Sequence, residues 1–278
     1  MSSVSVTILQ AGHCTCPEHI AIQGGRWRNI RFPAMFALIE HPRCGPMLFD
    51  TGYSERFFRE TRRFPNRLYR LATPVTLEQK QMAQFQLAER GIRPVDIERV
   101  FISHFHADHI AALGDFSQAR YVYLPQGYAA VRSLGGWRAL ARAYLPGLLP
   151  SDFTERAAPM DMAAARPLPP EYAPFTVGFD LLGDESLLAV ELPGHATGQM
   201  GLLARTENGT TFFFVADAAW LMRSIASNRL PHALANLIFS HPRLYRLTLA
   251  QLHRFHISRP EVRIIPSHCE ETLAQYTG

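Results

Sequence analysis

Residues 103–110 read Ser-His-Phe-His-Ala-Asp-His-Ile, directly after the β-type run Ile97–Ser103. Three imidazoles and one carboxylate therefore fall within six positions at the end of an expected strand. The turn that follows can aim the first two histidines to one side and bring Asp108 and His109 to a neighbouring point. That geometry suits two metal ions a few ångströms apart, and imidazole and carboxylate are standard zinc donors. Without a metal, several polar groups would need other partners.

Three further candidate ligands stand at later strand ends. His195 follows an apolar run in Pro-Gly-His, Asp217 follows Phe212–Phe214, and His268 follows Ile264–Ile265. Each signal alone is weak, but their shared position makes the set strong. The expected metal ligands are His104, His106, Asp108, His109, His195, Asp217 and His268.

The rest of the chain alternates strands and helices. An antiparallel hairpin is expected around Asn208-Gly209, and the Asp50-Thr51-Gly52 triplet indicates a turn. Thr76 is expected to cap a helix from about Leu77 to Arg90, with Gly91 as its C-terminal glycine. A second helix should cover Thr248 or Leu249 to His256. Expected strands span residues 4–9, 34–40, 47–49, 97–103, 187–192, 200–204, 211–215 and 262–265.

Composition fits a globular α/β protein. The 278 residues are 47% hydrophobic and carry a net charge of +4, which is not by itself typical of a nucleic-acid-binding protein. No apolar run reaches the roughly 18 residues of a membrane-spanning helix. The N-terminus resembles a first strand rather than a signal peptide, so a cytoplasmic location is expected. The four cysteines form no disulfide framework, and Cys14 and Cys16 are interpreted as ordinary small buried residues.

Two segments rich in arginine and aromatic residues, 53–75 and 127–150, fit this scheme less well. One interpretation is that they form surface helices with an amphipathic face. The other is that they form a lid or pocket wall over the metal site.

The order D-T-G, H-x-H-x-D-H, P-G-H, strand-Asp and strand-His resembles that of the metallo-β-lactamase superfamily, over nearly the whole chain. The resemblance implies a single α/β domain, 1–278, folded as an αβ/βα sandwich of two mixed β-sheets flanked by helices. It implies that Asp217 bridges the two metals and that Asp50 orients a ligand or structures the site floor. It assigns His104, His106 and His195 to one metal, and Asp108, His109 and His268 to the other.

Within that superfamily the chain is most similar to the N-acyl homoserine lactone lactonases. The similarity rests on Leu9–Cys14, Phe32-Pro33, the turn at Gly52, the helix ending at Gly91 and Asp96-Ile97. Those lactonases commonly carry a tyrosine three residues after the bridging aspartate, where this chain has Trp220. An indole donates an N–H but has no acidic phenol. The stretch after Pro-Gly-His, residues 196–199, also lacks a histidine that is frequent there.

The expected activity is metal-dependent hydrolysis of a carboxylic ester or lactone, such as an acyl homoserine lactone, by attack of a metal-bridging hydroxide. Candidate catalytic residues are Asp108 and Asp217, for proton handling, and Trp220. Phosphodiester or thioester hydrolysis is the alternative, favoured mildly by the arginine content, and a non-enzymatic metal-bearing binding protein is a third.

The expected cofactors are two divalent metal ions. Zinc fits the ligand types best, while iron, manganese and cobalt also suit mixed His/Asp sites. The expected partner is a small-molecule ester or lactone, with no nucleic acid and no membrane span; a homodimer is an alternative to a monomer.

Overall fold

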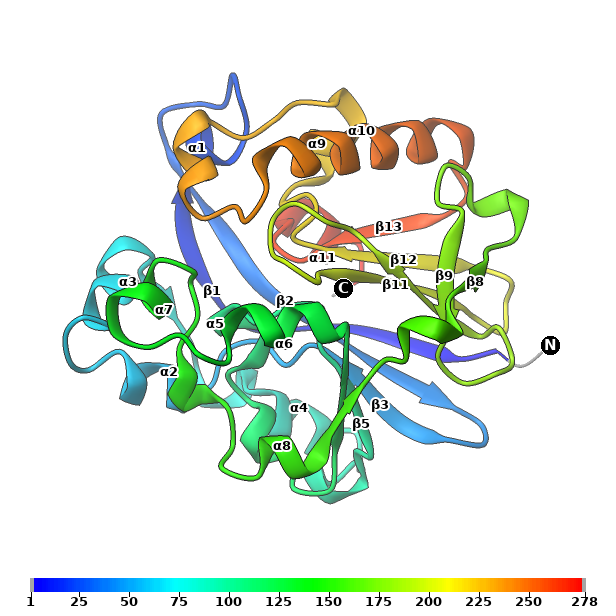
Figure 1. Cartoon of the computed structure of the whole chain (residues 1–278), viewed down its shortest axis with the longest axis horizontal. Helices are drawn as coiled ribbons and strands as arrows, with labels where there is room; N and C mark the ends of the chain where they lie inside the picture. The colour runs from blue at the N-terminus through cyan, green and yellow to red at the C-terminus, as the bar shows by residue number, and fades with distance from the viewer. Residues whose placement is uncertain (1–2, 277–278) are drawn as a thin grey trace.

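The computed structural model describes residues 3–276, which fold into two mixed β-sheets with helices on their outer faces (Figure 1). Within these residues, no helix has the length and apolar character needed to cross a membrane. The seven-stranded sheet has the order β4 (Val75–Thr76), β1 (Ser5–Pro17), β2 (Asn29–His41), β3 (Gly45–Phe49), β5 (Arg99–Phe101), β6 (Arg120–Tyr123) and β7 (Ala157–Pro159). The six-stranded sheet has the order β13 (Arg263–Pro266), β12 (Thr211–Ala216), β11 (Met200–Arg205), β10 (Leu187–Glu191), β9 (Val177–Asp180) and β8 (Arg166–Pro167).

Both sheets combine parallel and antiparallel pairs. Strands β1, β2 and β3 pair antiparallel, whereas β3, β5, β6 and β7 pair parallel. In the second sheet, β12 and β13 are parallel and the other pairs antiparallel. The parallel pairs matter for function because their carboxyl ends lie at one edge of each sheet.

Strand β2 shows how the sandwich is built. Successive side chains of a strand point to opposite faces. Ala34, Phe36 and Leu38 pack into the core under the helices, while the alternate residues Met35, Ala37 and Ile39 pack into the core between the sheets. A strand buried on both faces reads as a continuous apolar run, which is what the sequence showed. The expected αβ/βα sandwich is confirmed.

Helices cover both outer faces of the sandwich. Helices α4 (Ala83–Ala88) and α8 (Phe153–Arg156) lie against the first sheet, and the long α10 (Pro242–Ser258) lies over the second (Figure 1). The other α-helices are α1 (Glu18–Ala21), α2 (Glu55–Glu60), α3 (Arg67–Ala72), α5 (Ala107–Ile110), α6 (Pro125–Val131), α7 (Gly136–Leu140), α9 (Met222–Ser227) and α11 (Glu270–Leu273). The 3-10 turns are η1 (Gln79–Gln81), η2 (Pro94–Asp96), η3 (Leu113–Asp115), η4 (Pro146–Leu148), η5 (Met162–Ala164), η6 (Pro170–Tyr172) and η7 (Ala233–Leu237).

The helix predicted from Leu77 to Arg90 is wrong in its first half. Thr76 does not cap a helix, because it pairs with His13 in strand β4. The chain then forms η1 and restarts as α4 only at Ala83. Pairing with β1 overrides the local helical propensity of this stretch. Gly91 does adopt a left-handed φ of 75° just beyond the helix, as predicted.

The other helices and strands discussed agree more closely with their predicted positions. The predicted helical part from Thr248 or Leu249 to His256 lies inside helix α10, which begins at Pro242 with proline at its first position. The hairpin of β11 and β12 and the parallel β13 lie where the sequence placed them.

Candidate metal centre

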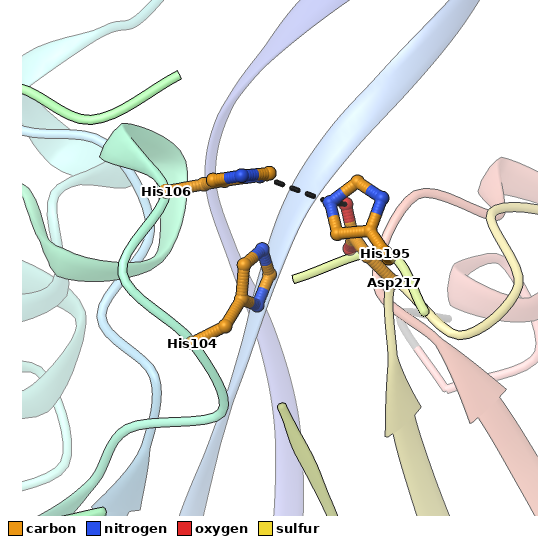
Figure 2. Close-up of side chains that lie close together, drawn as sticks. All are labelled: His104, His106, His195 and Asp217. Atoms are coloured by element: carbon orange, nitrogen blue, oxygen red, sulfur yellow. Dashed lines mark hydrogen bonds and ion pairs between the residues drawn. The ribbon is translucent and has the colours of Figure 1, made fainter. Parts of the chain in front are cut away.

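The seven predicted ligands gather at one edge of the sandwich. The loop after β5 carries His104 and His106, and helix α5 carries Asp108 and His109. The other three come from the ends of β10, β12 and β13. Figure 2 shows His104 and His106 approaching from one side, opposite His195 and Asp217. All seven residues are between 1% and 8% exposed, so the sandwich buries a strongly polar cluster.

The donor atoms fall into two groups, each compact enough to hold one cation. One group is His104, His106, His195 and Asp217, and the other is Asp108, His109 and His268. Within each group the candidate ligand atoms lie within 4.8 Å of one another. The division agrees with the one implied by the family resemblance, with Asp217 facing both groups: its Oδ2 lies 3.1 Å from His195 Nε2 and its Oδ1 3.3 Å from His109 Nε2.

Several atoms at the centre of the cluster have no hydrogen-bond partner. They include His104 Nε2, His109 Nε2 and Asp217 Oδ1. In addition, His195 Nε2 lies 2.9 Å from His106 Nδ1, so two ring nitrogens face each other (Figure 2). Unpaired buried acceptors are costly, and a cation between them removes that cost. The residues present therefore fit two divalent metal ions.

Asp50 fixes how His104 and His109 present their rings. Its Oδ1 accepts from the Ser103 amide at 2.8 Å, and its Oδ2 accepts from the Ser103 hydroxyl at 2.7 Å and from His109 Nδ1 at 2.8 Å. With its proton given to Asp50, the Ser103 hydroxyl accepts from His104 Nδ1 at 3.0 Å. Both rings therefore carry their proton on Nδ1 and turn the Nε2 lone pair toward the cluster.

His268 is oriented by the backbone instead. Its Nδ1 donates to the Pro33 carbonyl at 2.8 Å, which leaves Nε2 facing Asp217 at 3.2 Å. The Phe32 ring stacks on the imidazole, with centroids 5.2 Å apart. Such outer contacts set the tautomer and direction of a metal-binding histidine.

The backbone is strained on both sides of the cluster. Asp50, just after β3, and Ala216, just before Asp217, have left-handed φ values of 60° and 47°. Non-glycine residues rarely adopt this conformation, and it concentrates at functional sites. Two residues later, Gly52 has φ 66°, and a Cβ there would lie 2.5 Å from Ala11 Cβ, so only glycine fits this turn.

Burial and neighbouring charges shift the pKa values in opposite directions. Burial, followed by the adjacent imidazoles, lowers the pKa of His104 and His106 well below the ordinary histidine value. Burial works against a raised pKa at His109, but Asp50, Asp108 and Asp217 outweigh it and hold that pKa well above the ordinary value. Likewise, burial opposes ionisation of Asp217, yet the surrounding histidines keep its pKa well below the usual range. The shifts thus keep His104 and His106 neutral and Asp217 charged, whereas the carboxylates around His109 favour its protonated form as long as no cation is bound.

A cavity of about 340 Å³ opens directly above the cluster. Its floor is formed by Asp108, His195, Asp217 and His268. No arginine or lysine among the described residues lines it. The walls are mostly apolar and consist of Cys14, Thr15, Cys16, Pro17, Ile20, Phe32, Tyr53, Tyr69, Ala72, Thr73, Trp220, Leu234, Ala235 and Ile238.

The structure places Trp220 beside the metal cluster, as the sequence suggested, and shows where its donor points. Its Nε1 donates to Asp217 Oδ2 at 3.1 Å. The indole N–H therefore holds a candidate ligand, and the ring forms part of the cavity wall. A direct role of Trp220 toward substrate stays a prediction.

Two cysteines of the wall were not anticipated, whereas a pocket wall had been one of the two interpretations of the segment 53–75. Cys14 and Cys16 were interpreted as ordinary buried residues, yet both line the cavity. Helix α3, in the segment 53–75, contributes Tyr69 and Ala72 to the wall, whereas residues 127–142 line only a smaller pocket behind His106. The alternation of β1 could have indicated that both cysteines share a face. Nothing in the sequence pattern singles out Tyr69.

A sandwich of this architecture, with a buried histidine–aspartate centre beneath an apolar cavity, defines the class of metal-dependent hydrolases. The chain belongs to the metallo-beta-lactamase superfamily, whose sequence profile matches residues 37–249. The predicted family is therefore confirmed, and the protein is a metal-dependent hydrolase.

Individual relatives point to the predicted branch of that family. The chain is 26% identical to the N-acyl homoserine lactonase AttM of Rhizobium radiobacter over 248 residues, covering 86% of this chain and 85% of the relative. It is 24% identical to the N-acyl homoserine lactonase AiiB of Agrobacterium fabrum, covering 82% and 76%. The predicted similarity to the lactonase branch is thus confirmed.

Solved structures share the fold. An N-acyl homoserine lactone hydrolase, with the product N-hexanoyl-L-homoserine bound at its catalytic metal centre, superposes with a TM-score of 0.73 and 17% identity, over 99% of this chain and 97% of the other. The dizinc quorum-quenching lactonase AidC superposes with a TM-score of 0.65 and 13% identity, over 96% and 88%.

Proposed function

We propose that the protein hydrolyses a lactone or related carboxylic ester, with N-acyl homoserine lactones as the substrate class. The observation that carries the proposal is the apolar cavity whose floor is the histidine–aspartate cluster. A neutral substrate with an apolar acyl group suits such walls. The names of the relatives AttM and AiiB support the same substrate class.

We further propose that all seven predicted ligands would hold two zinc ions, with Asp217 contributing to both donor groups. When bound, two such cations would lower the pKa of a water molecule and polarise a carbonyl, which is the chemistry that hydrolysis needs. The protein itself orients the ligands through Asp50, Ser103 and the Pro33 carbonyl. Asp108 and Asp217 both form part of the cavity floor, where a carboxylate can accept a proton.

Hydrolysis of an anionic phosphodiester is less consistent with this cavity. The arginine content of the sequence had mildly favoured an anionic substrate. However, no arginine or lysine within residues 3–276 lines the cavity over the cluster, so a phosphate charge would find no side-chain cation there.

A substrate panel tests the proposal. Protein loaded with two equivalents of zinc should hydrolyse acyl homoserine lactones or aryl esters faster than thioesters or bis-aryl phosphates, measured as kcat/KM. His106→Ala should abolish the activity and lower the metal content. His256→Ala is the matched control, because His256 lies on α10 outside both donor groups. A preference for phosphate esters over every lactone would overturn the substrate proposal.

A further inference from the structure

Tyr69 of helix α3 lines the cavity, together with Cys14 and Tyr53. Its ring is held in place by an edge-on contact with Phe57, with centroids 5.5 Å apart. The end of α3 is fixed as well, because the Thr73 amide and hydroxyl both donate to the Tyr69 carbonyl, at 2.9 Å and 2.8 Å. Tyr69 is therefore a positioned part of the wall.

Most other polar donors of the cavity are already committed. Trp220 donates to Asp217, the Thr73 hydroxyl donates to the backbone of Tyr69, and the Cys16 thiol donates to the Pro17 carbonyl. His268 donates to Pro33.

The hydroxyl groups of Tyr53 and Tyr69 differ in whether they already have a hydrogen-bond partner. The Tyr53 hydroxyl shares a hydrogen bond with the Cys14 thiol. The Tyr69 hydroxyl has no hydrogen-bond partner within residues 3–276, and the much smaller Thr15 hydroxyl is the other uncommitted group of the wall. A phenol with an apolar body and a free hydroxyl is suited to bind a polar atom of a ligand.

Tyr69 lines the same cavity as the candidate ligands Asp108 and Asp217. A neutral phenol can donate a hydrogen bond to a ligand oxygen that carries no proton of its own.

We propose that Tyr69 is a catalytic residue whose hydroxyl donates a hydrogen bond to an oxygen of the substrate's reacting carboxyl group. The inference rests on the proposed hydrolase function of the same cavity. The phenol transfers no proton; its hydrogen bond strengthens as negative charge develops on the substrate oxygen, which stabilises the transition state more than the bound ester.

Tyr69→Phe tests the inference, because it removes one hydroxyl and keeps the ring that packs on Phe57. We expect kcat to fall by about 10- to 100-fold with KM changed by less than about threefold, since one donor to a developing oxyanion contributes factors of this order or larger. Zinc content and thermal midpoint should match the wild type. Tyr128→Phe, in the aromatic cluster with Phe105 and Phe153 and outside this cavity, is the matched control.

A series of substrates separates this role from a structural one. The loss in Tyr69→Phe should grow from activated 4-nitrophenyl esters to unactivated lactones, because less activated substrates accumulate more charge on oxygen. An unchanged kcat, or an equal loss for every substrate, would overturn the inference. If the wild type hydrolyses only bis-aryl phosphates, the proposed substrate class fails, and the carboxyl-oxygen role of Tyr69 fails with it. If the wild type hydrolyses esters or lactones and Tyr69→Phe is equally active on them, only the role of Tyr69 fails.

Discussion

Asp50 determines which ring nitrogen of His104 and of His109 carries the proton. It lies in a left-handed conformation after β3 and accepts hydrogen bonds from Ser103 and from His109 Nδ1. Asp50→Asn keeps the size of the side chain but replaces one acceptor oxygen by an NH₂ donor. Because that donor would face either Ser103 or His109, we expect the affinity for one zinc equivalent to fall by about 10- to 100-fold.

Titration against a competing chelator measures this affinity. Asp152→Asn is the control, because the Asp152 side chain lies at the surface and pairs with Arg156 alone within residues 3–276. Equal zinc affinity in wild type and Asp50→Asn would show that Asp50 does not orient the ligands.

The indole of Trp220 holds the Asp217 carboxylate through one hydrogen bond. Trp220→Phe retains an aromatic wall but removes the N–H that donates to Asp217 Oδ2. A hydrogen bond to a charged group contributes about 1.5 kcal/mol or more, so we expect kcat/KM to fall by at least about tenfold while both zinc ions remain bound. Steady-state kinetics with metal analysis measures both quantities. Full activity in this variant would mean that Asp217 does not need the indole.

At the scale of elements, the short helix α1 depends on one buried carboxylate. Glu18 is 1% exposed and accepts from Arg28 at 2.8 Å, and it lies 2.7 Å from Arg223 of α9. Helix α1 in turn supplies Ile20 to the cavity wall. Glu18→Gln should therefore lower the free energy of unfolding at pH 7 by about 1 to 3 kcal/mol, the contribution of hydrogen bonds to a charged group.

The pH dependence has a definite sign. Hydrogen bonds from Arg28 and Arg223 lower the pKa of Glu18 from 4.5 to about 2. A depressed folded-state pKa gives stability that is present above pH 4.5 and is lost as the pH falls toward 2. The difference between wild type and Glu18→Gln should hence shrink over that window, in urea unfolding of the metal-free proteins. Glu207→Gln, in the exposed β11–β12 turn, is the control. A difference that is constant with pH would contradict this role.

The sequence was informative about strand ends and much less so about helices. His195, Asp217 and His268 could be placed because apolar runs delimit β10, β12 and β13, and parallel or neighbouring strands bring their ends together. The helix over 77–90 was mispredicted because Thr76 pairs with a strand more than sixty residues earlier. Tyr69 was missed because its place in the cavity wall also depends on tertiary packing. Only the packing of α3 on the rest of the protein brings its ring to the cavity.

At the scale of the whole molecule, the metal centre joins the two sheets. Four candidate ligands come from the segment after β5 in the first sheet, and His195, Asp217 and His268 come from strands of the second. The cavity walls are shared in the same way, from β1 and α3 to η7. An empty centre would leave opposing histidines and carboxylates buried without partners on both sides of this junction. Bound zinc should thus stabilise the fold as well as support hydrolysis.

Metal removal tests this coupling. A ligand present at about 100 times its Kd stabilises the native state by about 2.7 kcal/mol, so chelation should lower Tm by roughly 5 to 10 °C for a chain of this size. Scanning calorimetry with and without chelator measures the shift, and added zinc should reverse it. In His106→Ala, chelation should lower Tm by less, because one donor group is already incomplete. Zinc-saturated chelator is the control for effects of the chelator that are unrelated to zinc removal. An identical Tm for the zinc-loaded and chelated wild type would mean that metal binding does not hold the two sheets together.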